Sequence, residues 1–107
     1  MARYSIGEFE ELVLLAVRRL QREATGGAIQ DVLHAEAGRR ASLGAIYAVL
    51  DRAQRKDLVE SWLGAPRAAV GGRARRHYAL TAGGEQALSE SRRVRDALWR
   101  ATGEAAT

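Results

Sequence analysis

The spacing of apolar residues changes along the chain and thereby limits the folds that it can adopt. The spacing is helical up to residue 56, alternates as in a strand in two short segments before residue 81, and is helical again to residue 101. The predicted elements are helices over residues 7–22, 25–38, 42–56 and 81–101 and strands over residues 58–63 and 75–80. A loop with the only proline and a Gly71–Gly72 pair separates the strands. This order predicts a mainly α-helical fold with a small β-hairpin.

Hydroxyl residues and one glycine mark the predicted helix ends. Thr25, Ser42 and Thr81 are expected N-caps, because a side-chain oxygen can accept a hydrogen bond from the free N–H groups of the first turn. Gly38 suits the left-handed conformation that ends the second helix. The glycine pair that follows Thr25 indicates either close packing at that point or a frayed first turn.

The composition excludes several classes of function. The chain has 107 residues, 47% of them hydrophobic, which is enough for one modest core. It contains no cysteine, and its two histidines, His34 and His77, lie far apart without the spacing of a metal-ligand set. We also find no Ser-His-Asp arrangement, paired carboxylates or phosphate-binding loop. We therefore expect neither an enzyme nor a protein that needs a metal or a cofactor.

The apolar segments are also too short for a membrane protein. The first residues lack the basic and apolar regions of a signal peptide. The longest apolar run, residues 12–17, is far shorter than the roughly 20 residues that a membrane helix needs. We expect a cytoplasmic protein without membrane association.

Positive charge is concentrated in the middle of the chain. Residues 39–76 hold nine basic and three acidic residues, a local balance of +6, whereas the formal net charge of the whole chain is +4. Such a basic segment favours a surface that faces a polyanion, because lysine and arginine supply most phosphate contacts. A merely solvated arginine-rich surface is the alternative that charge alone leaves open.

The third predicted helix has two contrasting faces. A helical projection places the apolar residues Leu43, Ile46, Leu50 and Ala53 on one side. The opposite side collects small residues and then cations, namely Gly44, Ala45, Ala48, Arg52, Arg55 and Lys56. A solvated surface has no need of small residues at the start of a helix, but a helix that enters a groove does.

This helix, followed by a hairpin with a basic connection, is typical of a winged helix-turn-helix, in which the second helix of the motif enters the major groove of duplex DNA. Residues near the amino end of such a helix meet base edges, and later cations reach phosphates. The predicted DNA-contacting residues are Ser42, Gly44, Ala45, Tyr47, Ala48, Arg52 and Arg55 in the helix and Arg73 and Arg75 in the hairpin.

Some of these assignments have structural alternatives. Tyr47 either contacts DNA through its hydroxyl or completes the core as a half-buried aromatic residue. Arg73 and Arg75 either reach a phosphate or the minor groove or serve only solubility. Arg76 shares the strand parity of Tyr78 and should flank the core face.

The last predicted helix has an apolar stripe that is too thin for a core helix. Leu88, Val94 and Leu98, with Trp99 beside them, are expected to form a homodimer interface instead. We therefore divide the chain into a winged-helix domain, residues 1–80, and a dimerisation helix with its tail, residues 81–107. Trp99 as an interface anchor is favoured over Trp99 as part of a ligand site between subunits.

Several ordered motifs resemble the PadR family of transcriptional regulators. Residues 42–52 (SLGAIYAVLDR) look like the recognition helix of that family, and residues 71–81 (GGRARRHYALT) look like its wing and second strand. Residues 6–10 (IGEFE) and 12–16 (LVLLA) are similar to its first helix. Two departures are Thr25 before Gly26, where many members have tyrosine, and Asp57 in place of a glycine, although aspartate tolerates a left-handed turn.

The resemblance implies a dimer formed chiefly through the carboxy-terminal helices, which binds a dyad-symmetric operator and represses transcription. It also implies that some members respond to small aromatic ligands. The short segment after Trp99 predicts a short-form member without a large effector-binding domain. The main alternative function is a winged-helix module that contacts proteins in a transcription assembly, although such a helix would present large apolar residues outward.

Overall fold

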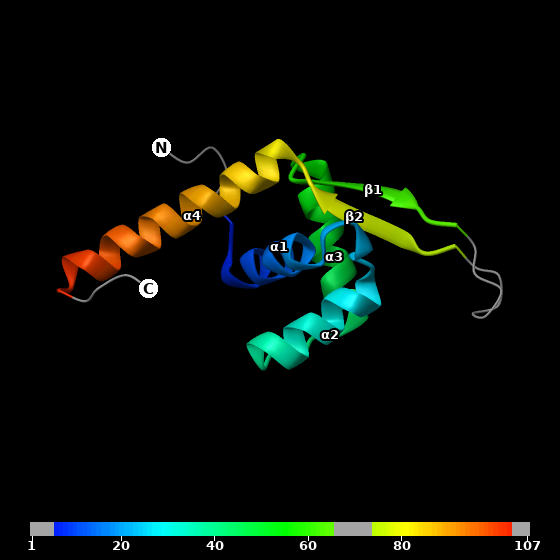
Figure 1. Ribbon diagram of the computed structural model, residues 1–107, viewed down its shortest axis with the longest axis horizontal. Helices are drawn as coiled ribbons and strands as arrows, with labels where there is room; N and C mark the ends of the chain where they lie inside the picture. Colours follow the sequence, from blue (N-terminus) through cyan, green and yellow to red (C-terminus); the bar gives the residue numbers. More distant parts are fainter. Residues whose placement is uncertain (1–5, 66–73, 104–107) are drawn as a thin grey trace.

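Three helices, a β-hairpin and a long fourth helix follow one another in the computed structural model, which describes residues 6–65 and 74–103 (Figure 1). The elements in order are α1 (Glu8–Leu20), a 3-10 turn (Gln21–Glu23), α2 (Gly26–Ala37), α3 (Leu43–Arg55), β1 (Val59–Leu63), β2 (Arg76–Leu80) and α4 (Ala82–Ala101). The order matches the predicted one, and the strands each begin one residue later than expected. The mainly α-helical winged-helix fold is thereby confirmed.

The helix starts are capped as the sequence predicts. The hydroxyl oxygen of each predicted cap, Thr25, Ser42 and Thr81, accepts one hydrogen bond from the backbone N–H of the residue three positions later. The distances are 3.2, 3.1 and 3.1 Å. Gly38 ends α2 in the left-handed conformation, with φ of 61°. Asp57 adopts the left-handed turn before β1, with φ of 64°, as its tolerance for that region allows.

The hairpin pairs β1 with β2 in antiparallel register, with Ser61 opposite Tyr78. An isolated bridge adds Ala24 as a short third partner, and the N–H of Tyr78 donates to the carbonyl of Ala24 at 2.9 Å. Tyr78 is buried against the helices, and this burial raises its pKa above the usual value of a phenol. The bridge ties the hairpin to the segment that leads into α2.

The core lies where α1, α2 and α3 meet beneath the hairpin (Figure 1). Its fully buried larger side chains are Leu14, Ile29, Ile46, Leu50, Leu58, Val13, Val17 and Val59. Leu43, which the helical projection assigned to the core, is 42% exposed, and Val49 is buried in α3 instead. A projection of one helix cannot show which of its apolar residues the neighbouring helices cover.

The start of α4 belongs to this core. Gly84 approaches the backbone carbonyl of Leu58 so closely that a Cβ would overlap it, and Ala87 and Leu88 are buried. Leu88 was expected at a dimer interface, and this expectation is wrong, because only 6% of the residue is exposed. Beyond its root, α4 extends away from the body on the side opposite the two strands of the hairpin (Figure 1).

Candidate DNA-binding surface

The outward face of α3 carries the small residues that the sequence predicts. Gly44, Ala45 and Ala48 are all exposed, whereas Ile46 and Val49 on the other face are buried. Since these outward residues have little or no side chain, another surface can approach the helix backbone closely. The predicted two-faced character of the helix is present in the structure for these positions.

Ser42 lies exposed at the amino end of this face. Its Oγ accepts the N–H of Ala45 at 3.1 Å, which uses one acceptor position of the hydroxyl. The hydroxyl hydrogen is left to donate to an oxygen outside the helix. The two predicted roles of Ser42, N-cap and polar contact, are therefore compatible.

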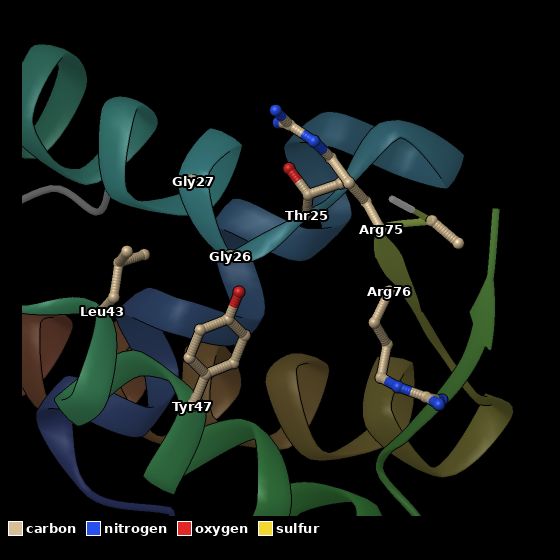
Figure 2. Close-up of a pocket in the computed structure, with 8 residues that line it drawn as sticks. Thr25, Gly26, Gly27, Leu43, Tyr47, Arg75 and Arg76 are labelled. Carbon is tan, nitrogen blue, oxygen red and sulfur yellow. The ribbon is translucent and has the colours of Figure 1, made fainter. Parts of the chain in front are cut away.

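Tyr47 is 45% exposed, and its ring lies against Gly26 at the start of α2 (Figure 2). A Cβ on Gly26 would come 2.5 Å from Tyr47 Cζ, so a side chain at this position would force the ring to move. Of the two explanations for the glycine pair, close packing is the correct one at Gly26. Tyr47 is thus half-exposed with its hydroxyl end beside α2, and its contact with DNA stays a prediction.

A recess of about 380 Å³ lies between α2, α3 and the residues that lead into β2 at the loop end of the hairpin. Its wall includes Thr25 and Gly27 from α2, Leu43 and Tyr47 from α3, and Arg75 from the hairpin (Figure 2). The Tyr47 hydroxyl points toward Gly26, and the Arg75 side chain extends beside Thr25 (Figure 2). The recess therefore joins Leu43 and Tyr47 of α3 to the hairpin, where Arg75 and Arg76 contribute positive charge.

The cations of the basic segment divide into paired and unpaired groups. Lys56 and Arg39 bind carboxylates of α1, since their nitrogens lie 3.0 Å from Glu10 Oε1 and Glu8 Oε1. Lys56 was expected on the outward face, and this expectation is wrong, because the end of α3 turns its last side chain toward α1. Arg55 pairs with Asp51 one turn earlier on the exposed surface.

Arg40, Arg52 and Arg75 are exposed and form no ion pair within residues 6–65 and 74–103. Arg76 donates to Ser61 Oγ at 2.9 Å, on the strand face that it shares with Tyr78, as its parity predicts. Arg73, the other predicted hairpin contact, lies outside the described residues. Among the described residues, ion pairs thus leave fewer arginine and lysine side chains of the basic segment available for a polyanion than the composition suggests.

Arg40 and the residues at the start of α2 were not among the predicted DNA-contacting residues. Arg40 precedes the Ser42 cap by two positions and so lies at the amino end of α3, beside the small-residue face. Its place in the basic segment was the available signal. Thr25 and Gly27 line the recess only because α2 packs across α3, which no local pattern reveals.

On the strand face opposite Tyr78, stacked side chains hold the loop end of the hairpin. The rings of Trp62 and His77 stack with centroids 5.8 Å apart, and the Arg22 guanidinium lies 4.2 Å from the centre of the Trp62 ring. His77 Nδ1 is also 3.0 Å from the carbonyl oxygen of Arg22. These contacts fix the direction in which the hairpin leaves the body, and with it the position of Arg75.

The far half of α4 exposes a second set of predicted residues. Val94, Leu98 and Trp99 are 43%, 64% and 58% exposed. Leu15 of α1, which the sequence analysis left out of this set, is also 44% exposed. Large apolar side chains on a helix that projects from the body form a surface that a partner can cover.

Other kinds of site are not found in the part of the chain that the structure describes. Within residues 6–65 and 74–103, no three His, Cys, Asp or Glu side chains are grouped so that they could hold a metal ion. No helix among these residues is long and apolar enough to cross a bilayer.

Known structures share this architecture. A PadR-like transcription factor from Bacteroides fragilis is 26% identical with a TM-score of 0.73, over 89% of this chain and 86% of that one. A PadR family regulator from Eggerthella lenta is 26% identical with a TM-score of 0.69, over 90% and 83%. Bacillus subtilis PadR in complex with operator DNA is 18% identical with a TM-score of 0.68, over 80% and 47%.

Of two sequence comparisons, the one with protein families agrees with these structures. Comparison with curated protein sequences found no significant match. The model of the transcriptional regulator PadR-like family matches residues 13–90, which include α2, α3, both strands and the buried start of α4. That family consists of transcriptional regulators and not of enzymes. By this match and by its winged-helix architecture, the chain belongs to the PadR-like family of transcriptional regulators.

Proposed function

We propose that the protein is a sequence-specific transcriptional repressor that binds duplex DNA as a homodimer. The observation that carries the proposal is the outward face of α3, where exposed Gly44, Ala45 and Ala48 are followed by Arg52, which forms no ion pair with the described part of the chain. The major groove of B-form DNA, about 12 Å wide, admits one helix whose contact face is smooth enough for close approach. The solved complex of Bacillus subtilis PadR with operator DNA supports this reading by analogy of fold.

In the proposed complex, α3 lies in the major groove and the hairpin follows the adjacent backbone. Ser42 and the small residues after it meet base edges, and Arg52 and Arg55 reach phosphates. Arg40 and Arg75 extend the contact on either side, and the Tyr47 hydroxyl points into the same recess. Arg55 must exchange Asp51 for a phosphate, so it contributes less than Arg52.

The proposed dimer is formed by the far half of α4. Val94, Leu98 and Trp99 would pack on the same surface of a second copy, and the exposed Leu15 of α1 is a further apolar residue that a partner could cover. Two-fold symmetry then presents two α3 helices to successive major grooves, about 34 Å apart, and predicts a dyad-symmetric operator. Occupation of such a site near a promoter would block transcription, and the protein would act in the cytoplasm.

The test combines duplex selection with salt titration. Duplexes selected from random DNA should share a dyad-symmetric sequence, and affinity for them should fall steeply with salt, by a log-log slope of about 0.9 for each neutralised phosphate. Sedimentation should show a dimer, and transcription in vitro from a promoter that overlaps the selected site should decrease. Weak and salt-independent binding to every duplex would reject the proposal and favour the protein-contact module.

A further inference from the structure

The far half of α4 has few ties to the rest of the protein. Only the first turns of the helix are buried, with Gly84, Ala87 and Leu88 against the body. The residues proposed to hold the partner, Leu98 and Trp99, are more than half exposed at the opposite end. The direction of α4 therefore decides where a partner subunit is held.

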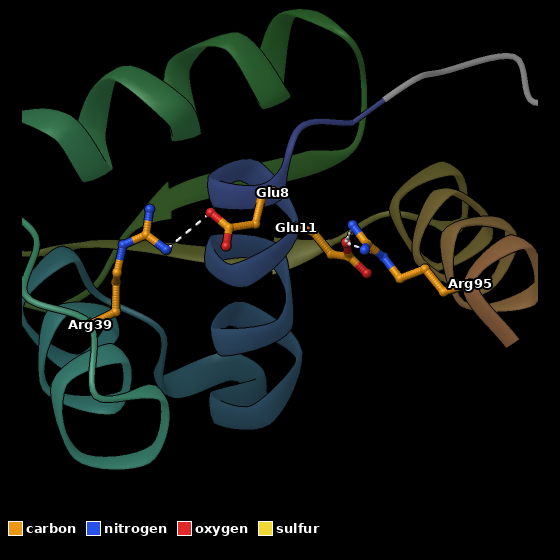
Figure 3. A network of polar contacts seen from close by, with 4 residues as sticks. All are labelled: Glu8, Glu11, Arg39 and Arg95. Carbon is orange, nitrogen blue, oxygen red and sulfur yellow. Dashed lines mark hydrogen bonds and ion pairs between the residues drawn. The ribbon is translucent and has the colours of Figure 1, made fainter. Parts of the chain in front are cut away.

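Two ion pairs connect α4 to α1. Arg18 Nε lies 3.0 Å from Glu85 Oε1 near the root of α4. Farther out, Arg95 donates from Nη2 at 2.8 Å and from Nε at 3.2 Å to Glu11 Oε1 (Figure 3). The earlier residue of α1 pairs with the later residue of α4, so the helices run past each other in opposite directions.

The two pairs differ in their surroundings. The side chains of Arg18 and Glu85 are 62% and 53% exposed, and such surface pairs contribute little. The Glu11 side chain is only 13% exposed, whereas that of Arg95 is 55% exposed, so this pair joins a largely buried carboxylate to a cation at the surface. Within the described residues, no other side-chain hydrogen bond joins α4 beyond Leu88 to the body.

We propose that Arg95, held by Glu11, sets the angle of α4 and thereby the half-site spacing of the operator that the dimer accepts. This inference rests on the proposed function, because it needs a dimer held by α4. Leu98 lies ten residues beyond Leu88, or about 15 Å along the helix. A tilt of about 10° would move Leu98 by about 3 Å, close to the 3.4 Å rise of one base pair. The ion pair at Arg95 therefore lies where a small change in the angle of α4 would change the half-site spacing by about one base pair.

The angle can be measured without DNA. Because the chain has no cysteine, Asp31→Cys in α2 and Arg100→Cys in α4 would take spin labels at two defined sites. Samples diluted with unlabelled protein report the distance within one chain. Arg95→Ala should shift or broaden this distance by about 3 Å or more. Arg93→Ala is the matched control, since Arg93 pairs with Glu90 inside α4, and it should leave the distance as in wild type.

The spacing is then measured with duplexes whose selected half-sites are separated by the optimal spacer or by one or two base pairs more or fewer. Wild type should prefer the optimal spacer by about tenfold or more, and Arg95→Ala by less than about threefold, because a freely directed helix loses the benefit of a matched span. Affinity for a single half-site should stay within about twofold of wild type. Arg95→Lys, which keeps the charge, should restore most of the preference.

The outcomes separate the two proposals. A wild-type protein that is monomeric, or that binds no duplex specifically, would overturn the proposed function and the spacing role with it. A wild-type dimer with a clear spacer preference that Arg95→Ala leaves unchanged would overturn the role of Arg95 alone. An unchanged spin-label distance in Arg95→Ala would do the same, and would show that the buried root of α4 fixes its direction.

Discussion

Lys56 Nζ, at the end of α3, donates a hydrogen bond of 3.0 Å to Glu10 Oε1 in the first turn of α1. Glu10 is the buried charged residue of the described core, with 8% exposure, and its Oε2 has no hydrogen-bond partner there. The proposed recognition helix is thus fixed at its carboxyl end by a carboxylate that would otherwise be buried alone. The position of α3 depends on this pair as well as on apolar packing.

Lys56→Met should destabilise the fold by about 1–3 kcal/mol, because it leaves the Glu10 carboxylate without its cation. Chemical denaturation measures the loss. Adding Glu10→Leu to Lys56→Met should recover part of it, since an apolar pair replaces a buried ionic one. Arg55→Met is the control, and removal of this exposed cation should change stability by less than about 1 kcal/mol. Equal effects of the two methionine variants would contradict the assigned role of Lys56.

Ala48→Glu should abolish specific duplex binding while the protein still folds. The position is exposed on α3, so the helix accepts the larger residue, but the carboxylate would meet the DNA in the proposed complex. Fluorescence anisotropy measures binding and thermal unfolding checks the fold. Ala35→Glu, at an exposed position of α2, serves as the control, and this variant should bind DNA nearly as wild type does. Normal binding by Ala48→Glu would show that another surface meets DNA.

Arg52→Ala should lower the salt dependence of binding more than Arg55→Ala does. Arg52 has no ion pair within the described residues, whereas Arg55 already pairs with Asp51. Loss of one phosphate contact in each subunit should reduce the log-log slope of the dimer by about 1.8. Titrations of both variants on selected and random duplexes measure the slopes. A larger slope change for Arg55→Ala would reverse the assignment of these two arginines.

Gly26→Ala should destabilise the fold by about 1–3 kcal/mol, because the new methyl group overlaps the ring of Tyr47. Its neighbour offers a matched control. A Cβ on Gly27 meets no atom within 4 Å, and Gly27→Ala should raise stability by about 0.5–1 kcal/mol through better helix propensity. Thermal unfolding compares the two variants. Combining Gly26→Ala with Tyr47→Ala should relieve the overlap, and a failure to do so would place the strain elsewhere.

Leu98→Asp combined with Trp99→Ala should convert the proposed dimer into a folded monomer with much weaker operator affinity. Both side chains are exposed in the single chain, so their loss removes no core packing. Sedimentation gives the mass, and circular dichroism checks the fold. Leu63→Asp, at an apolar residue of the hairpin with 61% exposure, is the control and should remain dimeric. A dimer that persists in the double variant would place the interface on α1, around the exposed Leu15.

Local rules in the sequence determined the elements and their ends. The hydroxyl caps at Thr25, Ser42 and Thr81 act within one helical turn, and the left-handed turn at Asp57 depends on a single residue. The periodicity of apolar residues likewise identified the outward face of α3. The larger apolar residues recur on one side of the helix, and Gly44, Ala45 and Ala48 lie on the other. These features need no knowledge of distant neighbours.

Only the tertiary structure decided which long-range partners these residues meet. Leu88 lies on the same stripe as Leu98, yet α4 packs on the body only near its root, so one side chain is buried and the other is exposed. Lys56 and Arg52 both add positive charge to the same predicted helix. Because α1 passes beside the end of α3, Glu10 of α1 pairs with Lys56 and not with Arg52. The pairing of Glu11 with Arg95, 84 residues apart, likewise depends on how α4 crosses α1, because helices come together through packing that no local pattern encodes.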